Sequence, residues 1–547
     1  MQVSPHPTGR HMMKRILAVL ATVLPLTAAV YLPPASAATP PGAAAPRCAA
    51  PPLRAPAGTR VESVTAESVA AGDVVVPPIP PQDGYTVPGV PARCEVTVTL
   101  THPGADDHAR IQVWLPASGW NGRLQTVGGS AYAAGDYGGQ LAAAVQGGYA
   151  AATTDAGVST YTDVSWALTA KGAINRPLLE NFASRSEHET AVLAKQVVSG
   201  AYGRPVAHAY FNGCSTGGRQ GYMEAQRHPD DYDGIAAHAP AISWDAFEVA
   251  TLWPQVVMAQ SHTYPTKCEF DAFTAAAVTA CDPTDGAKDG VIGDPAACDY
   301  DPRRLIGTRI DCDGVPTTIT AADAAVVREI WDGPRSGRGT KLWYGTPVGA
   351  DLSALAGVED GIAQPFPVPA AWVTTFVRKH PAEDATKLSY TEFEKAFRQS
   401  RAEFGGVIGT DDPDLSGFRR SGGKLLSWQG LADQYIPAAG TAAYRDRVED
   451  RMGGAGRVDD FYRLFLAPGT DHCAGPGNTG AAPTDPLGAL VDWVEHGKAP
   501  DTLPAAVTRA DGRTVTRDLC RYPRVSRYTG HGDVDEASSF RCVLPRR

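Results

Sequence analysis

The chain has 547 residues, of which 43% are hydrophobic and 20% are charged, and its formal net charge is −10 at pH 7. The length and the apolar content allow a large buried core and more than one structural unit. The negative charge argues against nucleic acid or an anionic membrane as the main partner. The ten cysteines form an even number, which suits disulfide bonding in an exported protein better than an intracellular enzyme.

The N-terminus has the pattern of a secretory signal peptide. Basic residues are followed by an apolar run at 16–32 and by a cleavage motif of the A-x-A type at 35–37. The apolar run is short for a membrane span and contains a proline. We therefore expect residues 1–37 to be a signal peptide, residues 38–47 to be a flexible leader rich in Ala and Pro, and the protein to be secreted and extracellular.

The next part of the chain alternates between predicted strands and a helix. Residues 94–100 and 110–115 alternate in polarity, as strands of a mixed sheet do. Residues 123–127 and 148–155 are also predicted strands. Residues 187–201 have the spacing of an amphipathic helix. This succession is typical of an α/β protein.

Residues 213–217 have the pattern G-x-S-x-G, with Ser215 at its centre. Residues 206–211 before it form a predicted strand, and residues 218–228 after it form a predicted helix. In an α/β-hydrolase, this order of strand, tight turn and helix lifts a nucleophilic serine above the sheet. The motif alone also occurs by chance in Gly-rich chains, but the flanking elements favour the α/β-hydrolase fold with Ser215 as the nucleophile.

The Gly-rich loop after the strand at 123–127 is a candidate for half of the oxyanion hole. In α/β-hydrolases one amide comes from such an early loop and the other from the residue after the serine. We therefore expect the backbone N–H of Thr216 and one N–H from Gly129 or Ser130 to bind the oxyanion. A plain glycine turn is the alternative for this loop.

Two later residues complete a candidate catalytic triad. The predicted strand at 424–429 leads to Asp433, and the predicted strand at 459–466 leads to a Pro/Gly loop that carries His472. With Ser215, they follow the order Ser, Asp, His that α/β-hydrolases use. Asp433 would hold the imidazole tautomer and His472 would act as the general base. Taken singly, an Asx-turn aspartate and a surface histidine are the simpler interpretations.

Two cysteines stand directly beside the candidate catalytic residues. Cys214 precedes Ser215 and Cys473 follows His472. If the serine and the histidine are within hydrogen-bonding reach, the two cysteines are close enough to form a disulfide bond. We therefore predict a Cys214–Cys473 bond that holds nucleophile and base in register.

Between residues 245 and 404 the alternation of strands and helices is lost. This segment contains four cysteines and clustered acidic residues, and its irregular stretches are too long for ordinary loops. We predict an inserted lid domain at 245–404, with the hydrolase domain divided into residues 48–244 and 405–547.

The segment includes an acidic loop in which Asp282, Asp285 and Asp289 are separated by glycines and small residues. Carboxylate and carbonyl oxygens are the ligands that Ca²⁺ prefers. Ala287 and Ala296 occupy positions that need acidic ligands in an EF-hand, so the loop is not an EF-hand. A solvated acidic turn is the alternative. His188 and His208 are expected to be packed or surface residues rather than metal ligands.

The pairs Cys214-Ser215 and His472-Cys473, together with Asp433, resemble the CS-D-HC arrangement of the tannase and feruloyl esterase family. The likeness extends over nearly all of the mature chain and includes residues 214–221, 228–234, 412–416, 422–426 and 520–523 with Cys542. It implies a secreted serine carboxylesterase that acts on aromatic acid esters and has a lid domain with a structural calcium ion.

The resemblance also implies the calcium ligands and the remaining disulfide bonds. The side chains of Asp282, Asp285 and Asp289 and the carbonyl groups of Ala287 and Val291 would bind the ion. The implied disulfide pairs are Cys48–Cys94, Cys268–Cys281, Cys298–Cys312 and Cys520–Cys542.

Feruloyl esterase activity, which releases hydroxycinnamic acid from plant cell-wall sugar esters, is the first expectation. A tannase that releases gallic acid and a hydrolase of mono(hydroxyethyl) terephthalate are alternatives. A secreted calcium-dependent binding protein without catalysis is a remote one, because all three triad residues are present. The expected partner is a small aromatic ester or a feruloylated polysaccharide. The candidates for the acyl pocket are Trp253, Phe366, Trp372 and Phe376.

Overall fold

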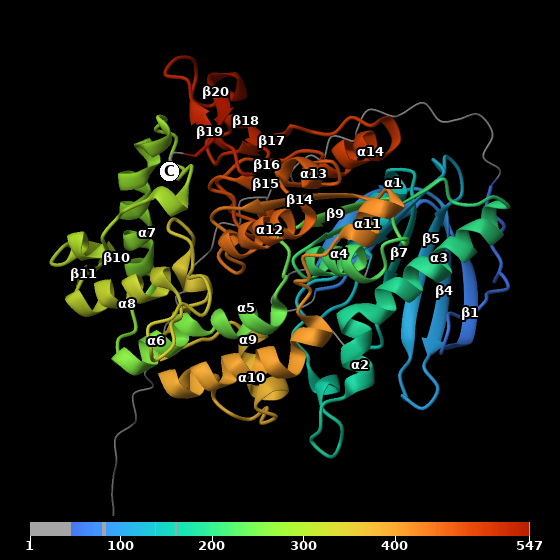
Figure 1. The fold of residues 1–547 in the computed structure, drawn as a ribbon, viewed down its shortest axis with the longest axis horizontal. Helices are drawn as coiled ribbons and strands as arrows, with labels where there is room; N and C mark the ends of the chain where they lie inside the picture. Colours follow the sequence, from blue (N-terminus) through green and yellow to red (C-terminus); the bar gives the residue numbers. More distant parts are fainter. Residues whose placement is uncertain (1–44, 79–83, 137, 159–160, 546–547) are drawn as a thin grey trace, which may run out of the picture. The chain divides into compact units, whose positions relative to one another are not determined.

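A computed structural model describes residues 45–78, 84–136, 138–158 and 161–545 (Figure 1). The predicted signal peptide and most of the predicted leader lie outside these residues. Among the helices of the described part, none is long and apolar enough to cross a bilayer.

The core of the structure is a nine-stranded mixed sheet (Figure 1). Its first four strands pair antiparallel, and the remaining strands pair parallel. In spatial order the strands are β1 (Arg60–Val69), β4 (Arg93–Thr101), β5 (Ala109–Pro116), β7 (Ala150–Thr154), β6 (Arg123–Val127), β8 (His208–Cys214), β9 (Gly234–His238), β14 (Lys424–Gly430) and β15 (Tyr462–Ala467).

Helices cover both faces of this sheet because successive strand residues point to opposite sides. Phe211 of β8 and Leu425 of β14 pack into a core shared with one set of helices, whereas the adjacent Tyr210 and Leu426 pack on the other side. The first set comprises α3 (Ser186–Tyr202), α4 (Thr216–Arg227), α11 (Ser416–Ser421), α12 (Ala438–Met452) and α13 (Ala455–Asp459). The opposite face is covered by α1 (Gly139–Gln146) and α14 (Pro486–His496).

The α/β-hydrolase prediction is confirmed by this sheet, but some element boundaries differ. The strand predicted at 206–211 is β8, which starts at His208 and continues to Cys214. The helix predicted from residue 218 starts at Thr216. Residue 459, predicted to begin a strand, ends helix α13 instead. The predictions missed these ends because apolar periodicity is a weak signal where a strand passes directly into a tight turn.

The segment between β9 and β14 is mainly helical. Its core includes residues from before β8, because Tyr132 and Phe182 belong to the same apolar cluster as the inserted helices. Besides α11, its α-helices are α5 (Trp244–Ala250), α6 (Trp253–Ser261), α7 (Lys267–Cys281), α8 (Ala321–Asp332), α9 (Pro367–Ala371) and α10 (Tyr390–Ile408). Helices α5 and α10 cross the boundaries predicted at 245 and 404, and the division into domains stays a prediction.

Shorter elements complete the described fold. Helix α2 (Arg176–Glu180) precedes α3, and the other small strands pair only with one another or in a three-stranded C-terminal sheet. They are β2 (Gly72–Val76), β3 (Tyr85–Val90), β10 (Arg309–Cys312), β11 (Val315–Thr318), β12 (Val358–Glu359), β13 (Ile362–Ala363), β16 (Ala482–Pro483), β17 (Thr502–Thr508), β18 (Thr514–Cys520), β19 (Val525–Tyr528) and β20 (Phe540–Val543).

Five disulfide bonds include all ten cysteines. Three have the expected partners, namely Cys48–Cys94, Cys214–Cys473 and Cys520–Cys542. The other two expected pairs are wrong: the structure joins Cys268 to Cys312 and Cys281 to Cys298.

The geometry of α7 explains this correction. Cys268 and Cys281 lie near opposite ends of the same helix. At 1.5 Å per residue their Cα atoms are roughly 20 Å apart, whereas a disulfide bond needs about 4.4–6.8 Å.

Candidate active site

The candidate nucleophile lies on a strained turn between β8 and α4. Ser215 has φ 64° and ψ −122°, a combination that non-Gly residues rarely adopt outside functional sites. The turn is tight: a Cβ atom on Gly213 would lie 2.7 Å from the Gly217 backbone, and one on Gly218 would lie 2.3 Å from the carbonyl oxygen of His238. These close approaches explain why glycines flank the serine.

The candidate acid and base come from loops after β14 and β15. Asp433 is fully buried, and its Oδ1 accepts hydrogen bonds from the backbone N–H groups of Tyr435 (3.0 Å) and Ile436 (2.8 Å). Its Oδ2 lies 2.9 Å from Nδ1 of His472. The carboxylate is therefore held by the backbone and aimed at the imidazole.

The charges around His472 favour its protonated form. Burial lowers the pKa of His472, but the charge and hydrogen bond of Asp433 and the charge of Asp471 outweigh it, so that the pKa is raised overall. The pKa of Asp471 is raised to about 6, mainly by burial and in part by the charge of Asp433. The backbone N–H of His472 donates to Oε1 of Gln434 at 3.0 Å and fixes the loop.

The structure brings Ser215 and His472 to one cavity of about 50 Å³. The disulfide bond between the adjacent Cys214 and Cys473 joins their loops, with a Cα–Cα distance of 6.1 Å. Among the residues that the structure describes, no hydrogen bond joins the Ser215 hydroxyl to His472. The link between nucleophile and base is thus the shared cavity and the disulfide.

The N–H of Gly129, which is one of the amides expected to form the oxyanion hole, donates to the Oε1 of Gln220 at 2.9 Å in this structure. The alternative Ser130 is also engaged, since its N–H donates to the Ala133 carbonyl at 3.0 Å. Both amides are used in holding the loop and are not directed at the cavity.

Ala131, the next residue of this loop, reaches the cavity. It lines the cavity with Ser215 and Thr216, and its φ of 49° turns the loop there. The Thr216 hydroxyl donates to the Ala131 carbonyl at 2.6 Å, which ties the loop to the start of α4. A left-handed alanine has no sequence signature, so the sequence could not indicate this residue.

Gln220 of α4 holds the same loop in two places and also binds helix α3, and the sequence predictions missed it. It is fully buried; besides the bond to Gly129, its Nε2 donates to the Ala134 carbonyl (2.7 Å) and to Oε1 of Glu187 (2.6 Å). Burial raises the pKa of Glu187 to about 8, although Arg219 and Gln220 lower it. The early loop is therefore fixed by a buried polar network.

The cavity walls differ from those expected. Phe366 lines the cavity as predicted, but Trp253, Trp372 and Phe376 do not; Trp372 and Phe376 are fully buried in the apolar core. The wall residues that the sequence predictions missed are Tyr161, Trp244, Phe247, Glu248, Thr251, Leu355, Val368, Tyr435 and Ile436.

A family model described as tannase and feruloyl esterase matches residues 94–543. The chain belongs to this family. It is 46% identical over 476 residues to a probable feruloyl esterase of Arthroderma benhamiae, covering 85% of this chain and 88% of that one. It is similar to the structure of a tannin acyl hydrolase from Aspergillus niger (TM-score 0.80, 26% identity, 91% and 94% covered). It is also similar to that of feruloyl esterase B from Aspergillus oryzae (TM-score 0.77, 26% identity, 89% and 97% covered).

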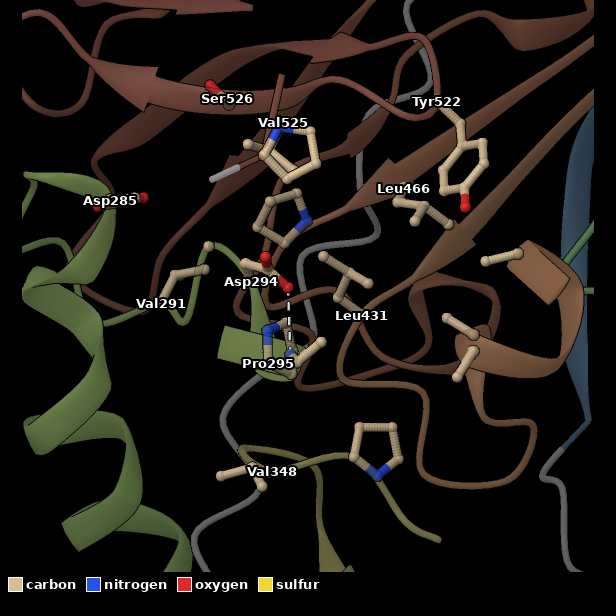
Figure 2. A pocket seen from close by; sticks show the side chains of 18 of the residues that line it. Asp285, Val291, Asp294, Pro295, Val348, Leu431, Leu466, Tyr522, Val525 and Ser526 are labelled. Atoms are coloured by element: carbon tan, nitrogen blue, oxygen red, sulfur yellow. Dashed lines mark hydrogen bonds between the residues drawn. The ribbon is translucent and has the colours of Figure 1, made fainter. Parts of the chain in front are cut away.

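This tannase and feruloyl esterase family member is a carboxylic ester hydrolase. It also has a larger cavity, of about 630 Å³, whose lining includes neither Ser215 nor His472. Figure 2 shows Asp285 and Asp294 on one side of it and Leu431 and Tyr522 on the other. The candidate nucleophile and base line the smaller cavity and not the larger one.

The predicted calcium loop borders the larger cavity, and its donor set fits a hard cation. The pKa of Asp285 is raised to about 6, mainly by burial and in part by the charges of Asp289 and Asp282. A bound cation would relieve this repulsion. The Asp282 carboxylate accepts the N–H groups of Asp289 and Gly290, both at 3.1 Å.

One contact in this loop competes with an ion: Arg517 pairs with Asp289. Within the described residues, the carboxylates of Asp282, Asp285 and Asp289 do not form a group whose ligand atoms all lie within 4.8 Å of one another. A calcium ion would therefore have to displace Arg517 or share Asp289 with it.

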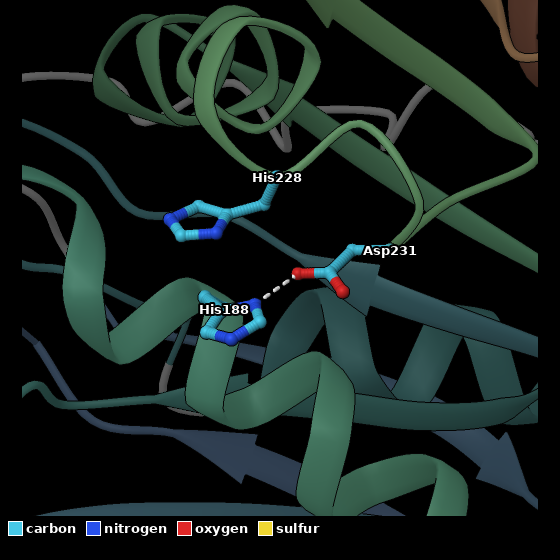
Figure 3. A group of neighbouring side chains, drawn as sticks. All are labelled: His188, His228 and Asp231. Atoms are coloured by element: carbon cyan, nitrogen blue, oxygen red, sulfur yellow. Dashed lines mark hydrogen bonds and ion pairs between the residues drawn. The ribbon is translucent and has the colours of Figure 1, made fainter. Parts of the chain in front are cut away.

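A different group of potential ligands is more compact. His188, His228 and Asp231 place ligand atoms within 4.8 Å of one another, and Figure 3 shows the two rings stacked beside the carboxylate. His188 Nδ1 and Asp231 Oδ2 are 2.6 Å apart. Burial lowers the pKa of His228 to about 4, with a contribution from the charge of His188. An ion pair covered by a neutral ring accounts for this arrangement, in keeping with the packing role expected for His188.

Proposed function

We propose that this esterase uses Ser215, His472 and Asp433 as a catalytic triad. The observation that carries the proposal is the 2.9 Å contact between His472 Nδ1 and Asp433 Oδ2, made beside a cavity that His472 shares with Ser215. The imidazole Nε2 removes the serine proton as Oγ attacks the ester carbonyl carbon. His472 then protonates the leaving alcohol, and water attacks the acyl-enzyme with His472 again as base.

The oxyanion hole is assigned to the N–H groups of Thr216 and Ala131. Support comes from their common position at the cavity and from the bond between the Thr216 hydroxyl and the Ala131 carbonyl. Amides held in advance of the reaction stabilise the tetrahedral intermediate without reorganisation.

For the acyl group, a hydroxycinnamoyl ester such as a feruloyl ester is the best-supported substrate. The cavity walls include Trp244, Phe247, Phe366 and Tyr435, which suit an aromatic acid. Among the described residues of the lining, none is Lys or Arg, so the negative charge of a terephthalate monoester would be buried without a partner. Gallate has three hydroxyl groups and would need more polar partners than this wall offers.

Substrate binding requires the cavity to widen. Its volume of about 50 Å³ is well below the 300–1,000 Å³ or so that is usual for ligand pockets. Phe366 of the inserted segment stacks on Tyr435, with ring centroids 4.6 Å apart, and Tyr435 in turn contacts the His472 ring edge-on. These two aromatic residues cover the base and are the side chains that would move.

The catalytic assignment is tested by Ser215→Ala and His472→Ala. Each should lower kcat for methyl ferulate by about 10⁴-fold or more, because the triad acts as a unit. Ser199→Ala, on the outer part of α3, is the matched control and should leave kcat unchanged. Retention of a tenth of the wild-type kcat by either triad variant would contradict the assignment. Parallel kcat/KM values for methyl gallate and mono(hydroxyethyl) terephthalate test the acyl preference.

Two further properties belong to the proposal. A structural Ca²⁺ would be held by the carboxylates of Asp282, Asp285 and Asp289 and by the carbonyl groups of Ala287 and Val291; it would stabilise the lid and take no part in the chemistry. Secretion is supported by the signal-like N-terminus and by the five disulfide bonds, which persist in oxidising compartments.

A further inference from the structure

One wall of the active-site cavity is a single face of helix α5. The cavity is lined there by Trp244, Phe247, Glu248 and Thr251. These positions follow the spacing i, i+3, i+4 and i+7, which puts their side chains on one side of a helix. This wall thus contains one carboxyl group, in the same cavity as Ser215.

The Glu248 carboxyl is buried and lacks a partner. The residue is 4% exposed. The Thr251 hydroxyl donates at 3.1 Å to the backbone carbonyl of Glu248 and not to its side chain. Within the described part of the chain, no donor or cation contacts the carboxyl group, and burial alone raises its pKa well above the usual range. Burial thus favours the protonated form of this carboxyl group.

An unpartnered buried carboxyl beside a nucleophile is best explained by a ligand. Burying such a group without a hydrogen bond destabilises the folded protein. Among the described residues, Glu224 also has carboxyl oxygens without a partner, but it does not line the cavity that holds Ser215. In its protonated form the group has one O–H donor and a carbonyl acceptor. A phenol hydroxyl is complementary, because it also donates one hydrogen bond and accepts another.

We propose that Glu248 forms a subsite for a ring hydroxyl of the aromatic acyl group. This inference rests on the proposed function, since it places the acyl group against the α5 wall. The ring would pack on Trp244 and Phe247, and its hydroxyl would replace the missing partner of Glu248. The ligand class is a hydroxylated aromatic acid, and Glu248 is a specificity-determining residue that does not contact the reacting ester.

The test compares methyl ferulate with methyl 3,4-dimethoxycinnamate, in which the ring hydroxyl is methylated. We expect the wild type to prefer ferulate by about 10-fold or more in kcat/KM, because a site built for a hydroxyl leaves polar groups unpaired with the analogue. Glu248→Met, or Glu248→Leu if that variant does not fold, should reduce the preference to less than about 3-fold. Glu248→Gln should keep most of it, since the amide also donates and accepts.

Phe247→Leu is the matched control from the same wall. It should lower kcat/KM for both esters together and leave their ratio unchanged. Turnover of p-nitrophenyl acetate confirms that each variant is folded and has a working triad. An unchanged ratio in folded Glu248→Met or Glu248→Leu would overturn the subsite. If the wild type hydrolyses p-nitrophenyl acetate but neither cinnamate ester, the proposed substrate class fails and the subsite fails with it.

Discussion

Removing the Cys214–Cys473 bond separates two roles of this disulfide, stabilising the fold and positioning the catalytic loops. The bonded residues are 259 positions apart, and the Cys268–Cys312 bond inside that loop bypasses 44 of them. The remaining loop of about 215 residues corresponds to roughly 5 kcal/mol in the chain-entropy model. At about 2.1 cal/mol/K per residue, this predicts a decrease in Tm of about 5 °C for a Cys214→Ala, Cys473→Ala variant.

The effect on catalysis should exceed the effect on stability. The bond holds the residues next to Ser215 and His472, and Asp433 constrains only the histidine. A displacement of about 1 Å between reacting groups can lower the rate about 10²-fold. We therefore expect the kcat of the double variant to fall by about that factor at a temperature where it is fully folded.

The matched control is the Cys48→Ala, Cys94→Ala variant. This bond closes a loop of 46 residues and contributes about 4 kcal/mol in the same model, but it lies at β4, away from the residues that line the catalytic cavity. Its removal should lower Tm by a similar amount and leave kcat unchanged.

Scanning calorimetry and initial rates with p-nitrophenyl acetate at 20 °C give both quantities. Peptide mapping without reductant should recover Cys214 and Cys473 in one linked fragment. If the Cys214→Ala, Cys473→Ala variant is folded and keeps its kcat within about 3-fold of the wild type, the positioning role is refuted.

Three other predictions follow from the site. Asp433 raises the pKa of His472 above 6.5, so His472 becomes protonated and stops acting as a base as the pH falls through that pKa. The acid midpoint of kcat/KM should therefore lie above pH 6.5. A lower midpoint would contradict the assignment. A chelator should lower Tm without changing kcat at low temperature, because a bound ion stabilises only the folded state. The Asp285→Ala variant should show the same two results. An unchanged Tm in the chelator would show that the loop binds no ion. Gln220→Leu should lower kcat by roughly 10- to 100-fold, because the Gly129 loop loses its hydrogen bonds to Gln220. It should also lower the free energy of unfolding by about 1–3 kcal/mol for each buried group left unpaired. A wild-type kcat would show that the loop keeps its position without Gln220.

The sequence was sufficient to predict the fold and the candidate triad because both depend on local patterns. The segment of β4 alternates in polarity, that of β14 is mostly apolar, and the motif around Ser215 is flanked by a predicted strand and a predicted helix. The chain order of Asp433 and His472, each after a strand, then placed them at one edge of a parallel sheet. The fold and the approximate positions of these three residues are thus set by elements that follow one another in the chain.

The remaining features depend on packing between segments distant in the chain. The partners of Cys268 and Cys281 were mispredicted because spacing does not reveal that α7 holds them at opposite ends. Likewise, the rotation of α5 that brings Glu248 to the cavity results from its packing in the inserted segment.

The oxyanion loop illustrates the division between sequence and tertiary structure. The glycines at 128 and 129 indicated by themselves that this loop approaches the serine turn. Only the folded structure shows which groups of this loop are engaged: Gln220 from α4 binds the Gly129 N–H, and the Thr216 hydroxyl binds the Ala131 carbonyl beside the cavity. The physical reason is that hydrogen-bond partners across about 90 residues are set by the packing of α4 on the sheet, which no local pattern encodes.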